Sequence, residues 1–384
     1  MTYKLRNICD YAKDKIEVSL LNNHTYISTE NMLPDKRGIS KATSLPKTSK
    51  TQHYKIKDIL VSNIRPYFKK IWHAKFEGGC SNDVLIFRAK DNIDPNFLYY
   101  VLSDDKFFEY STATSKGTKM PRGDKKAIMD YDVPNYSLTT QQKIASILKS
   151  IDDKIELNNA INENLAKQTQ SILYHFMNEY PFQLKPLSTI ADVIDCLHSK
   201  KPSSVENSTY QLIQLDNIRD DGFLDMSACK YMITKSDYEK WTRKCEIVEG
   251  DCVITNVGRI GAVSQAPYGT KAAMGRNMTC IRLKNNQTLH SYFITVLLSN
   301  HMRQQIQSNT DEGTIMGALN VKNIPKLLFP IFEPSIMAQL ESVLHPLSKQ
   351  IEYNNLQNQT LVQVRDALLP KLMSGKIDVS HINI

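Results

Sequence analysis

The chain has 384 residues, of which 41% are hydrophobic and 23% are charged, and its formal net charge is +8. This composition is typical of a soluble globular protein, and the length allows two or three domains with their own cores. A run of about 18 apolar residues is absent, so the sequence predicts no membrane-spanning helix. The first residues lack the apolar core of a signal peptide, which predicts a cytoplasmic location.

The seven cysteines are odd in number and form no C-x-x-C pair. Disulfide frameworks and zinc sites usually have regular cysteine spacings. The pattern therefore favours reduced, mostly buried thiols, and we expect no metal site in this chain.

The positive charge is concentrated in the first part of the chain. Residues 1–140 hold 23 lysines and arginines against 16 acidic residues, whereas residues 186–334 hold 16 against 15. A basic surface fits a polyanion such as DNA, although an ordinary solvated surface has the same composition. Charge alone therefore permits DNA binding without establishing it.

The first segment is predicted to contain both strands and helices. Alternating apolar residues predict a strand over residues 56–64, and CSNDVLIFRA (80–89) predicts another. The amphipathic pattern of residues 96–113 predicts one helix.

Two stretches of this segment combine basic residues with other features that suit DNA. In RPYFKKIW (65–72) basic residues alternate with aromatic ones, and in GTKMPRGDKKAI (117–128) they surround glycines. Such segments fit phosphates and base edges, but an aromatic barrel edge or a solvated loop would have the same composition.

The second segment repeats the first. GDCVITNVGRIG (250–261) matches KDILVSNIRPYF (57–68) at a shift of 193, which pairs Asp58 with Asp251 and Asn63 with Asn256. Asn82 matches Asn277 at a shift of 195, and from about residue 102 onward the shift is 196. Small insertions in loops produce this drift in a duplicated unit.

A heptad pattern follows each globular segment. Both patterns have seven apolar residues at ten seam positions, and asparagines interrupt both at the same places; the residues are Ile144, Leu148, Ile151, Ile155, Asn158, Asn162, Leu165, Thr169, Ile172 and Phe176, then Leu340, Leu344, Leu347, Ile351, Asn354, Asn358, Leu361, Arg365, Leu368 and Leu372. One amphipathic helix is usually ordinary core, but an in-phase second copy indicates two related long helices, over 141–177 and 337–373, that pack on each other. We expect Asn158, Asn162, Asn354 and Asn358 to fix the register of that pair.

The candidate catalytic motifs are incomplete. DVPNY (132–136) resembles the D/N-P-P-Y/F signature of amino-methyltransferases, but its first proline is replaced by Val133 and the repeat copy is LFPIF (328–332). A phosphate-binding G-x-x-x-x-G-K-[ST] loop, clustered carboxylates for magnesium and zinc-binding histidine spacings are absent. The sequence therefore predicts no active site.

Two globular segments that alternate with two heptad helices resemble the specificity subunit of type I restriction-modification systems. The motifs that carry the resemblance are DILVSNI (58–64), DCVITNV (251–257), the Gly-Thr pairs at 117 and 313, the helix start VPNYSLTTQQKIASILKSIDDKIELNN (133–159) and VRDALLPKLMSGKI (364–377). The match extends over nearly the whole chain.

This resemblance implies an α+β fold with an internal pseudo-twofold repeat. Two target-recognition domains, residues 1–140 and 186–334, would be separated by two long helices that form an antiparallel coiled coil. The first helix would occupy residues 141–185, and the second helix with a C-terminal tail would occupy residues 335–384. We expect the helix length to set the distance between the two parts of the DNA site.

The resemblance also implies a function. The chain would be a non-catalytic subunit of a prokaryotic, cytoplasmic complex, and each of its domains would read one part of a bipartite double-stranded DNA site. Two modification subunits would dock on it and supply adenine methylation, and restriction subunits would add translocation and cleavage. S-adenosylmethionine, ATP and magnesium are expected on these partners and not on this chain.

Candidate DNA contacts lie after the matched strands and in the Gly-Thr loops. Arginine and asparagine can make bidentate contacts to guanine and adenine, whereas lysine mainly contacts phosphate. The candidates are Asn63, Arg65, Tyr67, Lys69, Lys119 and Arg122 in the first segment, and Asn256, Arg259, Arg276, Asn277 and Thr314 in the second. Two alternatives remain: a coiled-coil scaffold without DNA readout, and a degenerate DNA methyltransferase that kept DVPNY.

Overall fold

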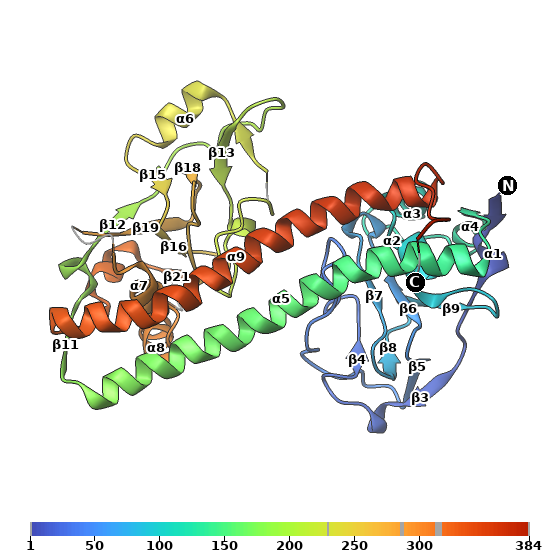
Figure 1. Cartoon of the computed structure of the whole chain (residues 1–384), viewed down its shortest axis with the longest axis horizontal. Coiled ribbons are helices and arrows are strands. Elements are labelled where there is room, and N and C mark those ends of the chain that lie inside the picture. The colour runs from blue at the N-terminus through green and yellow to red at the C-terminus, as the bar shows by residue number, and fades with distance from the viewer. Residues whose placement is uncertain (1, 229, 285–287, 312–316, 383–384) are drawn as a thin grey trace. The chain divides into compact units, whose positions relative to one another are not determined.

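A computed structural model of the protein describes residues 2–228, 230–284, 288–311 and 317–382. Its contacts divide the chain into two compact units: unit 1 is Met1–Ile155 with Leu361–Ile384, and unit 2 is Glu156–Thr360. Each unit combines sheets and short helices with part of both long helices, which confirms the predicted α+β class (Figure 1). None of the helices in these ranges is long and apolar enough to cross a membrane.

Two four-stranded sheets form the β part of unit 1. The first has the order β2-β9-β6-β7 with antiparallel neighbours, and its strands are β2 (Cys9–Tyr11), β6 (Ile59–Ser62), β7 (Ile71–His73) and β9 (Val84–Ala89). The second has the order β3-β5-β8-β4, and its strands are β3 (Lys15–Glu17), β4 (Tyr26–Ile27), β5 (Lys50–Tyr54) and β8 (Gly78–Cys80). All four residues of β6 are buried, so this strand lies at the centre of the unit.

The helices of unit 1 cover the first sheet. They are α1 (Leu5–Ile8), α2 (Pro95–Ser103), α3 (Asp105–Ala113) and α4 (Lys125–Ile128). The prediction of one helix over residues 96–113 is wrong, because Asp104 between α2 and α3 has an extended backbone and its carboxylate accepts a hydrogen bond from the Lys106 amide at 3.0 Å. An aspartate that caps the following helix competes with continuation of the preceding one. Phe97 and Phe107 still bury their rings in the same core.

Unit 2 also contains two four-stranded sheets. The first has the order β12-β19-β16-β17, and its strands are β12 (Ala191–Asp195), β16 (Cys252–Thr255), β17 (Val263–Gln265) and β19 (Met278–Leu283). The second has the order β14-β13-β18-β15, and its strands are β13 (Tyr210–Ile213), β14 (Met232–Ile233), β15 (Glu246–Val248) and β18 (Lys271–Met274). The remaining elements are α6 (Lys235–Trp241), α7 (His290–Leu297), α8 (Asn300–Ser308), β20 (Thr310–Asp311) and β21 (Ala318–Leu319).

The strand orders repeat between the units. β2-β9-β6-β7 corresponds to β12-β19-β16-β17, with every neighbour antiparallel in both. The register refines the sequence match, because Ser62 pairs with Val84 and Thr255 with Met278. Asp83, and not Asn82, therefore corresponds to Asn277, so the sequence alignment at this point is wrong by one residue.

A two-stranded ribbon ties the start of each globular part to the strand before its long helix. β1 (Thr2–Lys4) pairs with β10 (Asp132–Pro134) in unit 1, and β11 (Phe182–Pro186) pairs with β22 (Leu328–Phe332) in unit 2. The DVPNY motif thus lies at the start of a helix. The Tyr136 hydroxyl donates to the Met373 carbonyl at 3.1 Å near the end of the second long helix. This residue ties chain segments together within unit 1.

The predicted long helices are α5 (Leu138–Glu179) and α9 (Pro334–Met373). Within unit 2, Asn158 Nδ2 donates to Asn358 Oδ1 at 2.8 Å, and Asn354 Nδ2 donates to Asn162 Oδ1 at 2.8 Å. Residue numbers increase along α5 from Asn158 to Asn162 while those of their partners on α9 decrease from Asn358 to Asn354, so the two helices are antiparallel there. The structure thus pairs the seam asparagines, while their role in fixing the register stays a prediction.

In unit 1 the two helices meet through a partly buried polar group. Arg365 Nη1 lies 2.9 Å from Asp152 Oδ1, and the Tyr100 hydroxyl donates to Asp152 Oδ2 at 2.7 Å. Despite the burial of its guanidinium, which opposes the charge, the Asp152 and Asp366 carboxylates raise the pKa of Arg365. Arg365 is the polar residue of the second predicted seam that lies in unit 1, and it is paired with a carboxylate of the first helix.

Candidate DNA interface

An ion pair with a buried carboxylate lies beside the central strand of each unit. Arg88 donates to Asp58 through Nε at 2.8 Å and Nη2 at 2.7 Å, and Arg282 donates to Asp251 through Nε at 2.7 Å and Nη2 at 2.6 Å. Both aspartates have side chains that are 3% exposed. The hydrogen-bonded carboxylates raise the pKa of both guanidinium groups. The match between the two segments of the sequence identified the two aspartates as equivalent, but it did not identify the arginines that bind them.

The end of β6 is joined to the basic loop that follows α3. The Asn63 amide donates to the Asp83 carbonyl at 2.8 Å, and the Gly123 amide donates to the Asn63 carbonyl at 3.1 Å. Ile64 forms an antiparallel bridge with Arg122. These backbone contacts fix the base of loop 116–123 beside the end of the strand.

Unit 2 repeats this connection bond for bond. The Asn256 amide donates to the Asn277 carbonyl at 2.8 Å, and the Leu319 amide donates to the Asn256 carbonyl at 2.9 Å. Val257 bridges to Ala318, which corresponds to the bridge in unit 1. In both units a segment that follows the short helices is therefore held at the same edge of the same sheet: residues 122–123 in unit 1 and 318–319 in unit 2. Long-range pairing of this kind carries no local sequence signal beyond the shared shift between copies.

Asn63 and Asn256 lie beneath this edge and not on its surface. Their side chains are buried, at 7% and 6% exposure. Asn256 accepts from the Thr279 hydroxyl at 2.9 Å and donates to the Leu319 carbonyl at 3.2 Å. A Cβ added to Gly123 would approach Asn63 Oδ1 to 2.9 Å, so a larger residue there would displace the Asn63 side chain. The structure therefore favours a positioning role for both asparagines over direct contact with bases.

The other candidates of unit 1 lie around the base of loop 116–123. Arg65 has a left-handed backbone (φ 49°), its amide donates to the Pro121 carbonyl at 2.8 Å, and its Nε is buried without a hydrogen-bond partner among the described residues. Left-handed backbones cost about 1–3 kcal/mol at residues other than glycine and concentrate at functional sites. Tyr67 is 48% exposed.

The cations of this surface differ in how far they are already neutralised. Lys119 is exposed near the tip of the loop, whereas Arg122 Nη2 lies 3.1 Å from Asp83. Lys69 Nζ lies 3.0 Å from Asp105. Burial opposes ionisation of Asp105, but Lys36 and Lys69 lower the pKa of this carboxyl. Lys119 is therefore the candidate with its charge most available to a phosphate.

Unit 2 presents fewer available cations. Arg259 donates through Nη1 to the Ile218 carbonyl at 2.7 Å and pairs with Asp220, so its guanidinium is already engaged. Arg276 and Asn277 are exposed, and Asn277 has a left-handed backbone (φ 64°). Thr314 lies outside the described residues. DNA contact by each candidate in both units stays a prediction.

A buried group of possible metal ligands lies near the start of β16. Cys245, Asp251 and Cys280 are all buried and close together. Asp251 already binds Arg282 through both oxygens, as Asp58 binds Arg88 in unit 1. The ion pair accounts for this group without a metal.

A family model and two known proteins are similar to this chain in sequence. Residues 1–167 match the family model of the type I restriction modification DNA specificity domain. A type I restriction enzyme MjaIX specificity subunit from Methanocaldococcus jannaschii is 23% identical over 76% of this chain and 71% of its own length. The HindI specificity subunit from Haemophilus influenzae is 21% identical over 98% of this chain and 99% of its own.

A solved structure has the same fold over the whole length. The type I restriction-modification S subunit from M. genitalium matches with a TM-score of 0.54 at 16% identity, over 97% of this chain and 96% of the other. The predicted resemblance is confirmed: residues 1–167 match the DNA specificity domain of type I restriction-modification systems, and the relatives matched along the chain are type I specificity subunits. These relatives are named as specificity subunits, which agrees with the expectation that this chain is a non-catalytic subunit.

Proposed function

We propose that the chain reads a bipartite double-stranded DNA site and positions two modification subunits on it. The observation that carries this proposal is the repeated connection between strand and loop: Asn63 with Gly123 in one unit, and Asn256 with Leu319 in the other. Two sheets with the same strand order that present different loops suit the readout of two different half-sites.

The side chains around the two connections support unequal modes of binding. Unit 1 offers Lys119 for phosphate and Arg65, Tyr67 and Arg122 for base edges and the backbone. Unit 2 offers Arg276 and Asn277, with Arg259 already bonded within the unit. We infer that unit 1 gains more of its DNA affinity from charge than unit 2 does. The affinity of unit 1 for its half-site should therefore fall more steeply as the salt concentration rises.

The long helices are proposed to set the spacer between the half-sites and to dock the partner subunits. α5 has 42 residues and α9 has 40. At about 1.5 Å per residue each is roughly 60 Å long, which is comparable to one or two turns of DNA at about 34 Å each. Modification subunits would bring S-adenosylmethionine, and restriction subunits ATP and magnesium, to this prokaryotic cytoplasmic complex.

Methylation mapping tests the function. The chain is mixed with the modification subunit encoded beside it, and methylated adenines are mapped on genomic DNA. A split motif with a constant spacer is expected. A scaffold without DNA readout would give no sequence preference in the complex, and a methyltransferase would methylate DNA with this chain alone and lose activity on Tyr136→Ala. Either result would overturn the proposal.

A further inference from the structure

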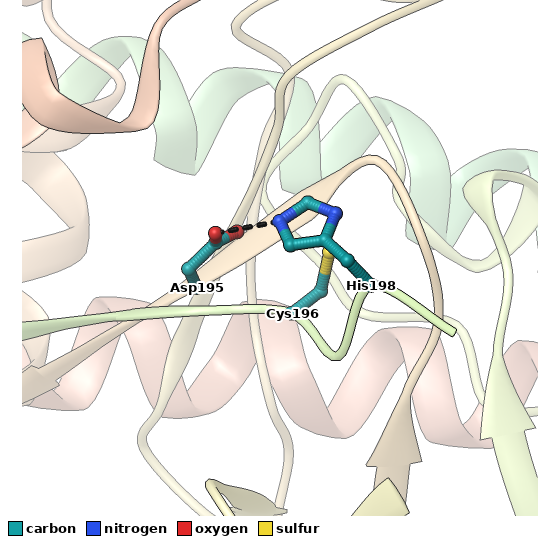
Figure 2. A group of neighbouring side chains, drawn as sticks. All are labelled: Asp195, Cys196 and His198. Atoms are coloured by element: carbon teal, nitrogen blue, oxygen red, sulfur yellow. Dashed lines mark hydrogen bonds and ion pairs between the residues drawn. The ribbon is translucent and has the colours of Figure 1, made fainter.

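Three side chains that can bind a metal meet at the end of β12 in unit 2. Figure 2 shows Asp195, the last residue of the strand, beside Cys196 and His198 of the turn that follows. One possible ligand atom of each lies within 4.8 Å of the other two. Carboxylate oxygen, thiolate sulfur and imidazole nitrogen are the three donor types of protein zinc sites.

One polar atom of this group has no hydrogen-bond partner among the described residues. His198 Nε2 lies 2.7 Å from Asp195 Oδ2, while Asp195 Oδ1 is buried and accepts no hydrogen bond within the described ranges. Cys196 is 2% exposed. A divalent cation would satisfy the carboxylate and take the place of the thiol proton, which would be released to solvent.

The group is not part of the architecture that the two units share. Ala191 pairs with Leu283 as Cys9 pairs with Ala89, which aligns the two strands. On that alignment the positions of Asp195, Cys196 and His198 are occupied in unit 1 by Lys13, Asp14 and Ile16. An ordinary His–Asp ion pair accounts for two of the three side chains but leaves the buried Asp195 Oδ1 without a hydrogen-bond partner among the described residues.

We propose that Asp195, Cys196 and His198 bind one zinc ion and leave its fourth coordination position open. His198 is 68% exposed, so solvent or a phosphate oxygen can reach that position. Backbone amides of Asn277 and Met278 lie against the Cys196 sulfur, so the ion would join the end of β12 to the Asn277 turn. It would also add positive charge to the nearly neutral second unit. The site departs from the sequence expectation of no metal, which rested on cysteine pairs and histidine spacings.

Cobalt(II) is the probe, because a bound thiolate gives it a near-ultraviolet charge-transfer band. The full chain is stripped with a chelator and titrated with cobalt and then zinc. We expect the band to saturate at one equivalent and to disappear when zinc displaces cobalt. Zinc at about 100 times its dissociation constant should raise the Tm of unit 2 by about 5–10 °C.

Substitutions separate the site from incidental binding. Cys196→Ser should abolish the band, and His198→Ala should weaken binding at least tenfold; because His198 is exposed, its substitution leaves the fold intact. Asp192→Asn is the matched control, since Asp192 is exposed on the same strand and should leave the titration unchanged. Binding that is unaffected by His198→Ala, or no saturable binding at all, would overturn the proposal. Neither result bears on DNA readout, because the zinc titration is done without DNA or partner subunits.

Discussion

Replacing Asn158 with leucine should destabilise unit 2 by about 1–3 kcal/mol, because a buried polar group that loses its partner bears the full cost of desolvation. Asn158 is fully buried, and its Nδ2 donates to Asn358 Oδ1 and Gln357 Oε1, both at 2.8 Å. Asn358 is only 8% exposed, so water cannot easily replace the lost donor. Replacing Asn358 as well removes the orphaned acceptor. The double variant should therefore recover to about wild-type stability or exceed it, with a coupling energy of about 1–3 kcal/mol.

Urea unfolding can isolate the unit concerned. The chain has two tryptophans, and Trp241 is buried in unit 2. In a Trp72→Phe background its fluorescence reports unit 2 alone. Asn164→Leu, at an exposed position of the same helix, is the control and should change the unfolding free energy by less than about 0.5 kcal/mol. If the two single effects simply add in the double variant, the hydrogen bond does not couple these residues and the reasoning fails.

The same asparagines carry the prediction about register. Leucine at Asn158, Asn162, Asn354 and Asn358 should stabilise the helix pair while allowing it to slip, because apolar seams specify register weakly. A complex with all four substitutions should then read more than one spacer length. A single, unchanged spacer would contradict this role.

Further substitutions test the interface and its support. Arg65→Gly should keep or raise stability by relieving the left-handed backbone, yet weaken DNA binding by about 1–3 kcal/mol in a filter assay. Lys119→Ala should lower the salt slope of binding by about one; an unchanged slope would remove Lys119 from the interface. Asp58→Ala should cost about 1.5–3 kcal/mol in urea unfolding, since the buried carboxylate that accepts two hydrogen bonds from Arg88 is lost while Arg88 keeps its partner Asp14. Asn355→Leu should stabilise unit 2, because both polar atoms of this buried side chain lack hydrogen-bond partners in the described ranges. Insertion of one heptad in both long helices should lengthen the methylated spacer by about three base pairs, since seven residues add roughly 10 Å.

The long helices were predictable because their pattern is local and is present twice. The predicted limits at 141–177 and 337–373 lie within three residues of the ends of α5 and α9. The prediction of one helix over residues 96–113 fails for the opposite reason: the capping carboxylate of Asp104 outweighs a continuous amphipathic pattern. Periodicity identifies which residues face a core, but it does not identify where a single side chain ends a helix.

Individual interface residues were harder to predict than the elements that carry them. Asparagine is a suitable base-reading residue, and the sequence could not reveal that Asn63 and Asn256 are buried beneath the loops. Their positions depend on the bridges Ile64–Arg122 and Val257–Ala318, which join residues about 60 apart in the chain. The partners Arg88 and Arg282 were missed for the same reason. Their shared shift of 194 was nevertheless visible in the sequence.

The central claim, that each unit reads its own half of a split site, is tested most directly by a domain exchange. Residues 1–140 are replaced with the corresponding segment of another specificity subunit, and adenine methylation is mapped with the modification subunit present. One half of the recognised motif should change while the other half and the spacer stay the same. A change in both halves, or in neither, would contradict the account.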